Sequence, residues 1–534
     1  MEQKRGMTRR DFLNRVGKVG GAVAVFGAME SLGLLSTSAS ASSFQPPTQG
    51  DLALTGRNGK RILILGAGIA GMTAAYELGK AGYDCHILEA RQRTGGRNWT
   101  VRRGTREQEI NGEMQTATYD PGHYFNAGPA RIPQHHVTMD YCKELGVPLE
   151  VFSNGNEHAF YYQENAGALS NQRYRKYEVK ADGRGYVAEL LAKAVNQSAL
   201  DDPLTSEDAE RLLEYLRREG GLSSDYTYQG SSARGYAELP GAGDQPGTLG
   251  QLHSFTDLLQ SGMMNNFSSE YSFNQQMMMF QPIGGMDQIP KALERKLPGK
   301  ITFGAIVREI RQTNGGVRIV YTTGSGGTQS MSGDYCICTI PLPVLKKIPA
   351  DFSAEMKNAM NQIGYATTGK IGLQFKSRFW ENEDRIYGGI TTTNMDINQI
   401  WYPSSDFLAQ KGILVGYYNF GNNAVALGNM SLAERQAHAL AQGTKIHPQY
   451  AAEFETGFSL AWHKIRYNEG GWASYSESDL QNYYPILNRP QGRVYLAGEH
   501  LSYYTGWMAG AFESARKVVT EIHEQVMKEE PVSA

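Results

Sequence analysis

The chain has 534 residues, of which 52 are Lys or Arg and 54 are Asp or Glu, so its formal net charge is −2. Hydrophobic residues make up 40% and charged residues 20%, which excludes a disordered, a collagen-like and a multi-span membrane protein. The nearly balanced charge gives no general attraction for nucleic acid or anionic lipid. Four cysteines are too few for a disulfide framework, and the length predicts about two to four structural units.

Residues 1–41 have the features of an export signal rather than of a folded domain. The pair Arg9-Arg10 fits the twin-arginine pattern, a weakly apolar run covers residues 20–35, and Ala39-Ser40-Ala41 fits the small-residue cleavage rule. The run is too short to span a bilayer, so we expect no stable membrane anchor. The sequence predicts a periplasmic or secreted protein, with residues 42–56 as a linker; a soluble N-terminal amphipathic helix is the alternative.

The first motif with chemical content is the glycine-rich segment RILILGAGIAG at residues 61–71. An apolar run of this kind is typical of a buried parallel strand, and a helical pattern follows it. Gly66 permits the tight turn, Gly68 lets the backbone approach a pyrophosphate, and Gly71 lets the helix pack on the strand. A second apolar run ends in Glu89, where a carboxylate can accept hydrogen bonds from ribose hydroxyls. Together these features predict a dinucleotide-binding βαβ unit.

No second loop of this kind occurs in a strand–helix setting, and residues 324–327 are predicted to form a hairpin turn instead. A flavoprotein with a single dinucleotide site cannot easily hold NADPH in a dedicated domain. The sequence therefore favours an oxidase or dehydrogenase over a pyridine-nucleotide reductase.

From Glu89 the chain continues with EARQRTGGR at residues 89–97, and this segment resembles the flavin amine oxidase family. In that family it wraps the FAD pyrophosphate, so the resemblance implies that Arg91 and Arg97 bring guanidinium groups to the phosphates. The resemblance to this family continues along the chain, in residues 281–287, Val307, residues 493–500 and residues 504–511.

The loop and the resemblance together predict the cofactor as FAD and a large set of binding residues. These residues are Gly66, Ala67, Gly68, Ile69, Ala70, Gly71, Glu89, Ala90, Arg91, Gly95, Gly96, Arg97, Gly128, Pro129, Ala130, Arg131, Val307, Trp472, Gly498, Glu499, Gly506, Trp507 and Met508.

The resemblance implies an α/β fold with α+β insertions, built on a Rossmann-type FAD-binding domain of the glutathione-reductase and amine-oxidase type. A mixed-sheet substrate domain and a helical domain complete it. We expect the FAD-binding domain at residues 57–113, 281–362 and 465–528. The substrate domain is expected at 114–170 and 363–464, the helical domain at 171–280, and a solvated tail at 529–534.

One block selects a branch of this family. Residues 124–133, YFNAGPARIP, resemble the L-amino-acid oxidases, in which the arginine of this turn, here Arg131, binds the substrate α-carboxylate. A guanidinium suits a carboxylate and repels the cation of a simple amine. The resemblance further implies that Tyr402 donates a second hydrogen bond to that carboxylate and that Lys370 holds a water near flavin N5. Trp507 is the expected aromatic wall, and the Gly506 carbonyl is available to the amino group.

Departures from the family pattern are also informative. Trp472 stands where monoamine oxidases carry a flavin-linking cysteine, so we expect non-covalent FAD. Ala473 replaces the first tyrosine of the monoamine-oxidase aromatic cage, which weakens the simple-amine interpretation. Residues 269–280 contain no histidine like that of some snake-type members, so no side-chain general base is assigned.

The remaining segments give coarser expectations. A helix capped by Thr205 or Ser206 should end at Gly220-Gly221, and residues 220–250 should form a long loop that is a candidate cover for the active-site entrance. The run at residues 277–280 is expected in the core or the pocket wall. Cys336 and Cys338 alternate on a buried strand, and we predict no metal site.

The predicted function is oxidative deamination of L-amino acids by O2, with hydride transfer from Cα to flavin N5, to give 2-oxo acids, ammonia and hydrogen peroxide. Amine or polyamine oxidase, amino-acid 2-monooxygenase and a non-enzymatic flavin-binding carrier are the alternatives. Relatives are often dimers, so a homodimer is expected.

Overall fold

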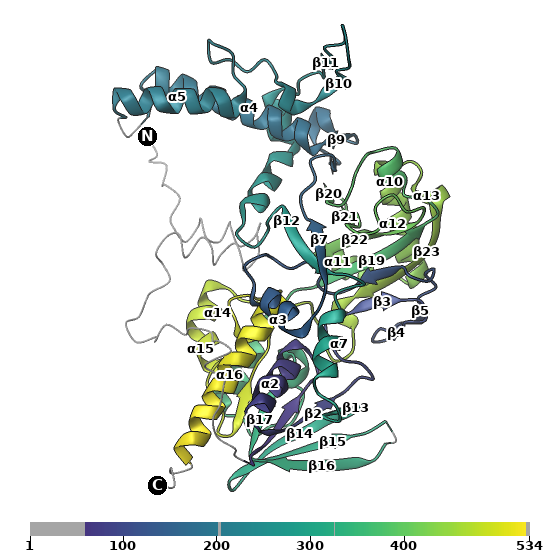
Figure 1. Ribbon diagram of the computed structural model, residues 1–534, viewed down its shortest axis with the longest axis vertical. Helices are drawn as coiled ribbons and strands as arrows, with labels where there is room; N and C mark the ends of the chain where they lie inside the picture. Colours follow the sequence, from purple (N-terminus) through teal and green to yellow (C-terminus); the bar gives the residue numbers. More distant parts are fainter. Residues whose placement is uncertain (1–58, 201–203, 325, 530–534) are drawn as a thin grey trace, which may run out of the picture.

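The computed structural model describes residues 59–200, 204–324 and 326–529. The predictions for residues 1–41, 42–56 and 530–534 lie outside these ranges. Figure 1 shows a lower part that contains a parallel sheet and the adjacent helices α2 (Ile69–Lys80) and α16 (Met508–Glu529), an upper part that contains a larger sheet, and a helical arm at the top. Within the described ranges, no helix is long and apolar enough for a bilayer crossing.

A five-stranded parallel sheet forms the centre of the lower part. In the order β13-β2-β1-β17-β25, its strands are Ile301–Phe303, Asp84–Glu89, Arg61–Leu65, Tyr335–Cys338 and Val494–Leu496. The apolar run at residues 62–65 is fully buried and pairs in parallel with β2 and β17, which confirms the predicted strand. Its burial on both faces explains why the run does not alternate.

Two layers cover this sheet. On one face, α2 (Ile69–Lys80) and α16 (Met508–Glu529) pack against each other and share one core. On the other face lies a three-stranded antiparallel sheet, β14-β15-β16 (Ile306–Thr313, Gly316–Thr322, Thr328–Gly333). The antiparallel pairing of β15 with β16 confirms the hairpin predicted at residues 324–327.

The upper part contains a mixed seven-stranded sheet. In the order β23-β19-β22-β21-β20-β8-β9, its strands are Phe454–Ala461, Thr368–Phe375, Gly412–Phe420, Gln399–Trp401, Ile390–Thr393, Phe160–Tyr162 and Arg173–Arg175. The β20–β8 pair is parallel and the other pairs are antiparallel. Ile371, Leu373 and Phe375 of β19 face a core that includes α12 (Leu432–Ile446). This sheet, together with the lower part, confirms the predicted fold class.

Shorter elements complete the two parts. The paired strands are β3 (Thr100–Arg102) with β6 (Tyr124–Asn126), β4 (Arg106–Gln108) with β5 (Met114–Thr116), β7 (Leu149–Ser153) with β12 (Met278–Pro282), and β18 (Gly364–Tyr365) with β24 (Ala473–Ser474). The helices are α3 (Val137–Leu145), α7 (Gln288–Arg295), α8 (Leu342–Leu345), α9 (Ala354–Gln362), α10 (Phe379–Asn382), α11 (Gly421–Gly428), α13 (Tyr450–Glu453), α14 (Glu477–Asn482) and α15 (Tyr484–Leu487).

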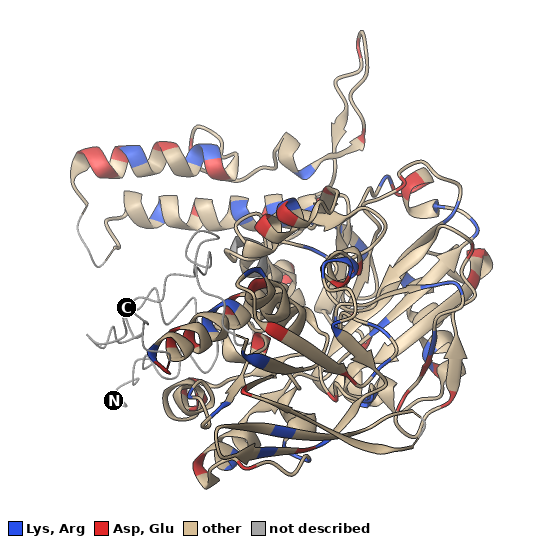
Figure 2. Cartoon of the chain, turned by 60° about the horizontal axis from the view of Figure 1, so that its bottom comes forward, with Lys and Arg blue, Asp and Glu red and all other residues tan. Residues whose placement is uncertain are grey.

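The arm consists mainly of α4 (Lys176–Asn196) and α5 (Ser206–Gly220), with α6 (Phe255–Ser261) and a 3₁₀ segment, Met263–Tyr271, nearer the body. The Thr205 hydroxyl accepts a hydrogen bond of 3.1 Å from the Asp208 amide, and Gly221 ends α5 in the left-handed conformation, as predicted. Basic and acidic residues are interspersed along α5 (Figure 2), where they form exposed i,i+4 pairs.

The prediction that residues 220–250 cover the active-site entrance is wrong in its placement. This segment forms the hairpin β10–β11 (Tyr236–Glu238 and Thr248–Leu249), which projects from the arm (Figure 1). None of its residues lines the large cavity described below. The loop packs on α4 because Arg234 forms a buried ion pair with Asp182.

Candidate functional site

A cavity of about 2470 Å³ lies between the parallel sheet and the seven-stranded sheet. It collects residues from both sheets, from the start of α2 and from the turn before α16. Most of the predicted site residues line it: Gly66, Gly68, Ile69, Ala70, Glu89, Ala90, Arg91, Gly95, Gly96, Arg97, Gly128, Pro129, Ala130, Arg131, Val307, Lys370, Trp472, Gly498, Glu499, Gly506, Trp507 and Met508. Ala67, Gly71 and Tyr402 do not line it.

The turn between β1 and α2 forms an open cradle. Gly66 has a φ of 106°, and a Cβ at Gly71 would lie 2.0 Å from the Gly66 carbonyl oxygen, so Gly71 serves helix packing rather than ligand contact. A Cβ at Gly68 would meet nothing within 4 Å, because this backbone faces the cavity. No side chain caps the N-terminus of α2, so its amides and dipole are available to a phosphate. The cradle fits a dinucleotide cofactor.

The Glu89 carboxylate braces this cradle from the end of β2. Its two oxygens accept hydrogen bonds from the backbone amides of Ala67 at 2.7 Å and Arg91 at 2.9 Å. A carboxylate has about four acceptor positions, so both oxygens can still accept from a ribose. The side chain of Arg91 donates to Asn468 at 2.6 Å and to the Arg466 carbonyl, which fixes it across the cavity wall.

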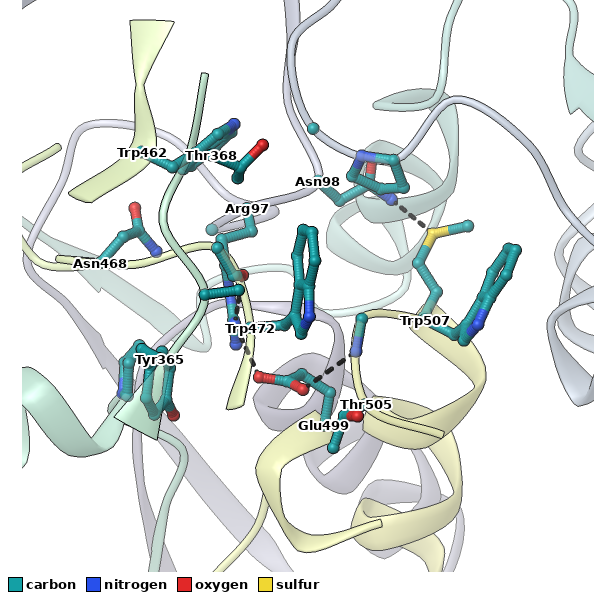
Figure 3. Close-up of a pocket in the computed structure, with 18 of the residues that line it drawn as sticks. Arg97, Asn98, Tyr365, Thr368, Trp462, Asn468, Trp472, Glu499, Thr505 and Trp507 are labelled. Carbon is teal, nitrogen blue, oxygen red and sulfur yellow. Dashed lines mark hydrogen bonds and ion pairs between the residues drawn. The ribbon is translucent and has the colours of Figure 1, made fainter. Parts of the chain in front are cut away.

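Glu499 is the centre of a second polar cluster, at the start of the last helix. Its carboxylate accepts from Arg97 at 2.7 Å, from the Ala473 amide at 3.3 Å and from the Gly506 amide at 3.2 Å. Figure 3 shows Glu499 between Arg97 and the turn that carries Thr505, with Trp472 beside Arg97 and above Glu499. The Nη1 group of Arg97 donates to Glu499 and to the Gly471 carbonyl. These bonds leave the Nε and Nη2 donors, and the contact of this guanidinium with a phosphate stays a prediction.

Arg131 lies deeper, on the loop after β6. Its guanidinium carbon is 4.4 Å from the ring centroid of Trp401 and 5.9 Å from that of Trp507. Its Nη2 donates to Gln275 at 2.9 Å, and its Nε is buried without a hydrogen-bond partner. Burial lowers the pKa of Arg131 to about 10, and only Tyr418 opposes this shift. Within the part of the chain that the structure describes, no carboxylate neutralises this guanidinium.

Lys370 is a buried cation that lines the same cavity. Its ammonium donates to the Gly128 carbonyl at 2.6 Å and lies 4.5 Å from the ring centroid of Tyr418 and 5.2 Å from that of Trp401. Burial and, to a smaller extent, the positive charge of Arg131 together lower the pKa of Lys370 to about 7. The two cations and two aromatic rings form a site with an unbalanced positive charge.

Tyr402 is not part of this site. Its hydroxyl is buried on the other side of the sheet, 2.8 Å from Thr391 Oγ1 and 2.7 Å from His447 Nε2. Trp401 lines the cavity, and neighbouring residues of a strand point to opposite faces, so Tyr402 must point away. The prediction that Tyr402 lies at this site is therefore wrong.

Tyr418, which the sequence analysis missed, lines the cavity instead. It is the register partner of Lys370 across β19 and β22, so both side chains share one face. A hairpin register between residues 368–375 and 412–420 would have identified it, but the sequence alone does not give that register.

Comparison with known proteins agrees with this geometry. A family model described as "flavin containing amine oxidoreductase" matches residues 69–523. A putative L-amino-acid oxidase of Bacillus subtilis (strain 168) is 28% identical over 87% of this chain and 95% of its own length. An L-amino-acid oxidase of Demansia vestigiata is 28% identical over 88% of each chain.

Solved structures support the fold. A putrescine oxidase bound to putrescine superposes with a TM-score of 0.59 and 19% identity, over 88% of this chain and 99% of that one. The cyclohexylamine oxidase of Brevibacterium oxydans IH-35A gives a TM-score of 0.59 with 18% identity, over 88% and 100% of the two chains.

Proposed function

Because the chain belongs to the flavin-containing amine oxidoreductase family, we propose that it is an FAD-dependent L-amino-acid oxidase. The overall reaction converts an L-amino acid, O2 and water into a 2-oxo acid, ammonia and hydrogen peroxide. The relatives named L-amino-acid oxidase support this choice. The observation that supports it most is that the Arg131 guanidinium has an unpaired Nε and no carboxylate partner among the described residues.

Arg131 is a partly buried residue whose guanidinium Nε is buried without a hydrogen-bond partner, and no carboxylate among the described residues pairs with it. A desolvated charge of this kind is costly unless an opposite charge pairs with it. The α-carboxylate of an amino acid supplies that charge and two acceptors for the planar fork. A simple amine supplies neither, and its cation is repelled by Arg131 and by Lys370 when Lys370 is protonated.

The glycine cradle, Glu89 and Glu499 would hold FAD. All four cysteines are buried and none is among the residues that line the cavity, which supports non-covalent binding beside Trp472. When bound, the flavin supplies an acceptor for the hydride that leaves the substrate Cα, and O2 restores its oxidised form.

The chain's own residues bind and orient the substrate. Arg131 and Tyr418 fix the carboxylate, and the Gly506 carbonyl accepts a hydrogen bond from the amino group. Together these contacts orient the substrate so that its Cα can approach the hydride acceptor closely. The amine must be neutral to assist hydride departure. Lys370 positions the water that hydrolyses the imino acid to the 2-oxo acid and ammonia.

The test is product analysis with purified, flavin-loaded protein. Each of the twenty L-amino acids is supplied with O2, and hydrogen peroxide, ammonia and 2-oxo acid are measured. Equimolar formation of the three products supports the proposal. Formation of an amide and CO2 would identify a 2-monooxygenase, and oxidation of amines alone would identify an amine oxidase. If no amino acid bleached the flavin under anaerobic conditions, the protein would be a flavin-binding carrier.

We further propose export by the twin-arginine route, cleavage before Ser42 and a homodimeric mature protein. The residues of the signal motif support the first two points. N-terminal sequencing of the exported protein tests them, and light scattering of the purified protein tests the dimer. A mature N-terminus at Met1 or a monomeric mass would contradict them.

A further inference from the structure

Gln275 is the only described side chain that hydrogen-bonds the guanidinium of Arg131. Its Oε1 accepts from Nη2 at 2.9 Å, and Gln275 itself lines the cavity. The amide oxygen thus occupies one donor of Nη2, while the neighbouring donor Nε has no partner. A neutral amide oxygen stands where one oxygen of a substrate carboxylate would be placed.

The segment that carries Gln275 is held against the Arg131 loop at several points. Asn274 Oδ1 lies 3.0 Å from His135 Nε2 and 2.9 Å from His136 Nε2. Gln276 Oε1 accepts from the Gln134 amide at 2.9 Å. These contacts fix the backbone on both sides of Gln275, so its side chain can move without the segment opening.

We propose that Gln275 is a displaceable latch on Arg131: it holds the guanidinium between Trp401 and Trp507 in the free enzyme and yields to the substrate carboxylate. This inference rests on the proposed function, because it assumes that Arg131 receives a carboxylate. The latch makes Gln275 a determinant of carboxylate affinity and of selectivity for substrates that carry an acid group.

The chemistry of the exchange favours a carboxylate over other groups. The amide offers one neutral acceptor, so only one donor of the edge is paired. A carboxylate offers two charged oxygens, one for Nε and one for Nη2, and charge-assisted hydrogen bonds are roughly twice as strong as neutral ones. A neutral or cationic substrate gains nothing over the amide, so Gln275 stays in place and such substrates are disfavoured.

The latch is tested with flavin-loaded protein and two carboxylates that lack an amino group, butyrate and 3-phenylpropionate. Their dissociation constants are measured from the perturbation of the flavin absorption bands. In Gln275→Glu an internal carboxylate pairs with Arg131, so we expect binding at least about tenfold weaker. In Gln275→Ala the competitor is gone, and we expect binding equal to or tighter than that of the wild type.

Gln276→Glu is the matched control, because it adds the same charge one residue away from the cavity wall and has no contact with Arg131. It should leave the dissociation constants within about twofold. Unchanged binding in Gln275→Glu, or weaker binding in Gln275→Ala, would overturn the latch while amino-acid oxidation by the wild type still supported the function. Failure of the wild type to bind either carboxylate would overturn both.

Discussion

Lys370 and Tyr418 are direct register partners on β19 and β22, and the Lys370 ammonium lies 4.5 Å from the centroid of the Tyr418 ring. The guanidinium of Arg131 adds a second positive charge to the same cavity, and it lowers the pKa of Lys370 while Tyr418 faces both cations. This cluster concentrates positive charge where we propose that the substrate acid group binds.

The first prediction concerns the pH dependence of stability. The pKa of Lys370 falls from 10.5 to about 7 on folding because of burial and the charge of Arg131. Between these values the unfolded chain binds more protons at this residue than the folded chain, so the contribution of Lys370 to the free energy of unfolding rises with pH. Lys370→Met removes that contribution. Between pH 7 and 10, the melting temperature of the wild type should rise relative to that of the variant as the pH increases. A constant difference between the two melting temperatures over this range would contradict the assigned pKa.

The two tyrosines give a second prediction. Tyr418→Phe removes a hydroxyl from the cavity wall and should lower kcat/KM for an amino acid about tenfold, because a hydrogen bond to a charged group is lost. Tyr402→Phe leaves the Thr391 and His447 partners unsatisfied and should destabilise the fold by about 1–3 kcal/mol, with kcat/KM within about twofold of the wild type. The reverse pattern in kinetics and melting temperature would restore Tyr402 to the site.

The sequence predicts those parts of the fold and the site whose residues lie close together in the chain. The βαβ unit was predictable because strand β1, Gly66, Gly68 and Glu89 are consecutive signals with a fixed geometry. The cavity lining at Arg131 was predictable from its motif, because the whole turn is local in the chain.

Other features depend on contacts distant in the sequence. Whether Trp401 or Tyr402 faces the cavity depends on the strand register, and a shift of one residue inverts the face. The pairing of Arg97 with Glu499 joins residues 402 positions apart, and the placement of residues 220–250 on the arm depends on the buried Arg234–Asp182 pair. No local pattern specifies such contacts.

Glu499 provides a third prediction. Its carboxylate accepts hydrogen bonds from Arg97, the Ala473 amide and the Gly506 amide, so Glu499→Gln leaves a partly buried guanidinium without its counter-charge. Breaking a fully buried pair costs about 3–5 kcal/mol. Because the Arg97 side chain is 21% exposed, we expect a smaller loss of stability, a lower melting temperature and less bound flavin per chain. Glu207→Gln, which removes one partner of an exposed pair, should change stability by at most about 1 kcal/mol. Full flavin occupancy in Glu499→Gln would contradict the role of this cluster.

Two glycines of α2 form a matched pair for a fourth prediction. In Gly71→Ala the new Cβ would lie 2.0 Å from the Gly66 carbonyl oxygen, whereas in Gly79→Ala it would meet nothing within 4 Å. Gly71→Ala should deform the cradle and release flavin. Gly79→Ala should stabilise the helix by about 0.5–1 kcal/mol and retain flavin. Titration of both variants with flavin measures their affinity for the cofactor. Tight flavin binding by Gly71→Ala would show that the cradle is not the cofactor site.

The central claim is that Arg131 recognises the substrate carboxylate. The most direct measurement compares kcat/KM for an amino acid and for the amine formed by its decarboxylation, in the wild type and in Arg131→Lys. Two charge-assisted hydrogen bonds are at stake, so the variant should lose about a hundredfold on the amino acid and change little on the amine. If both substrates lose equally, or if the amino acid is unaffected, Arg131 does not bind the carboxylate and the proposed function fails.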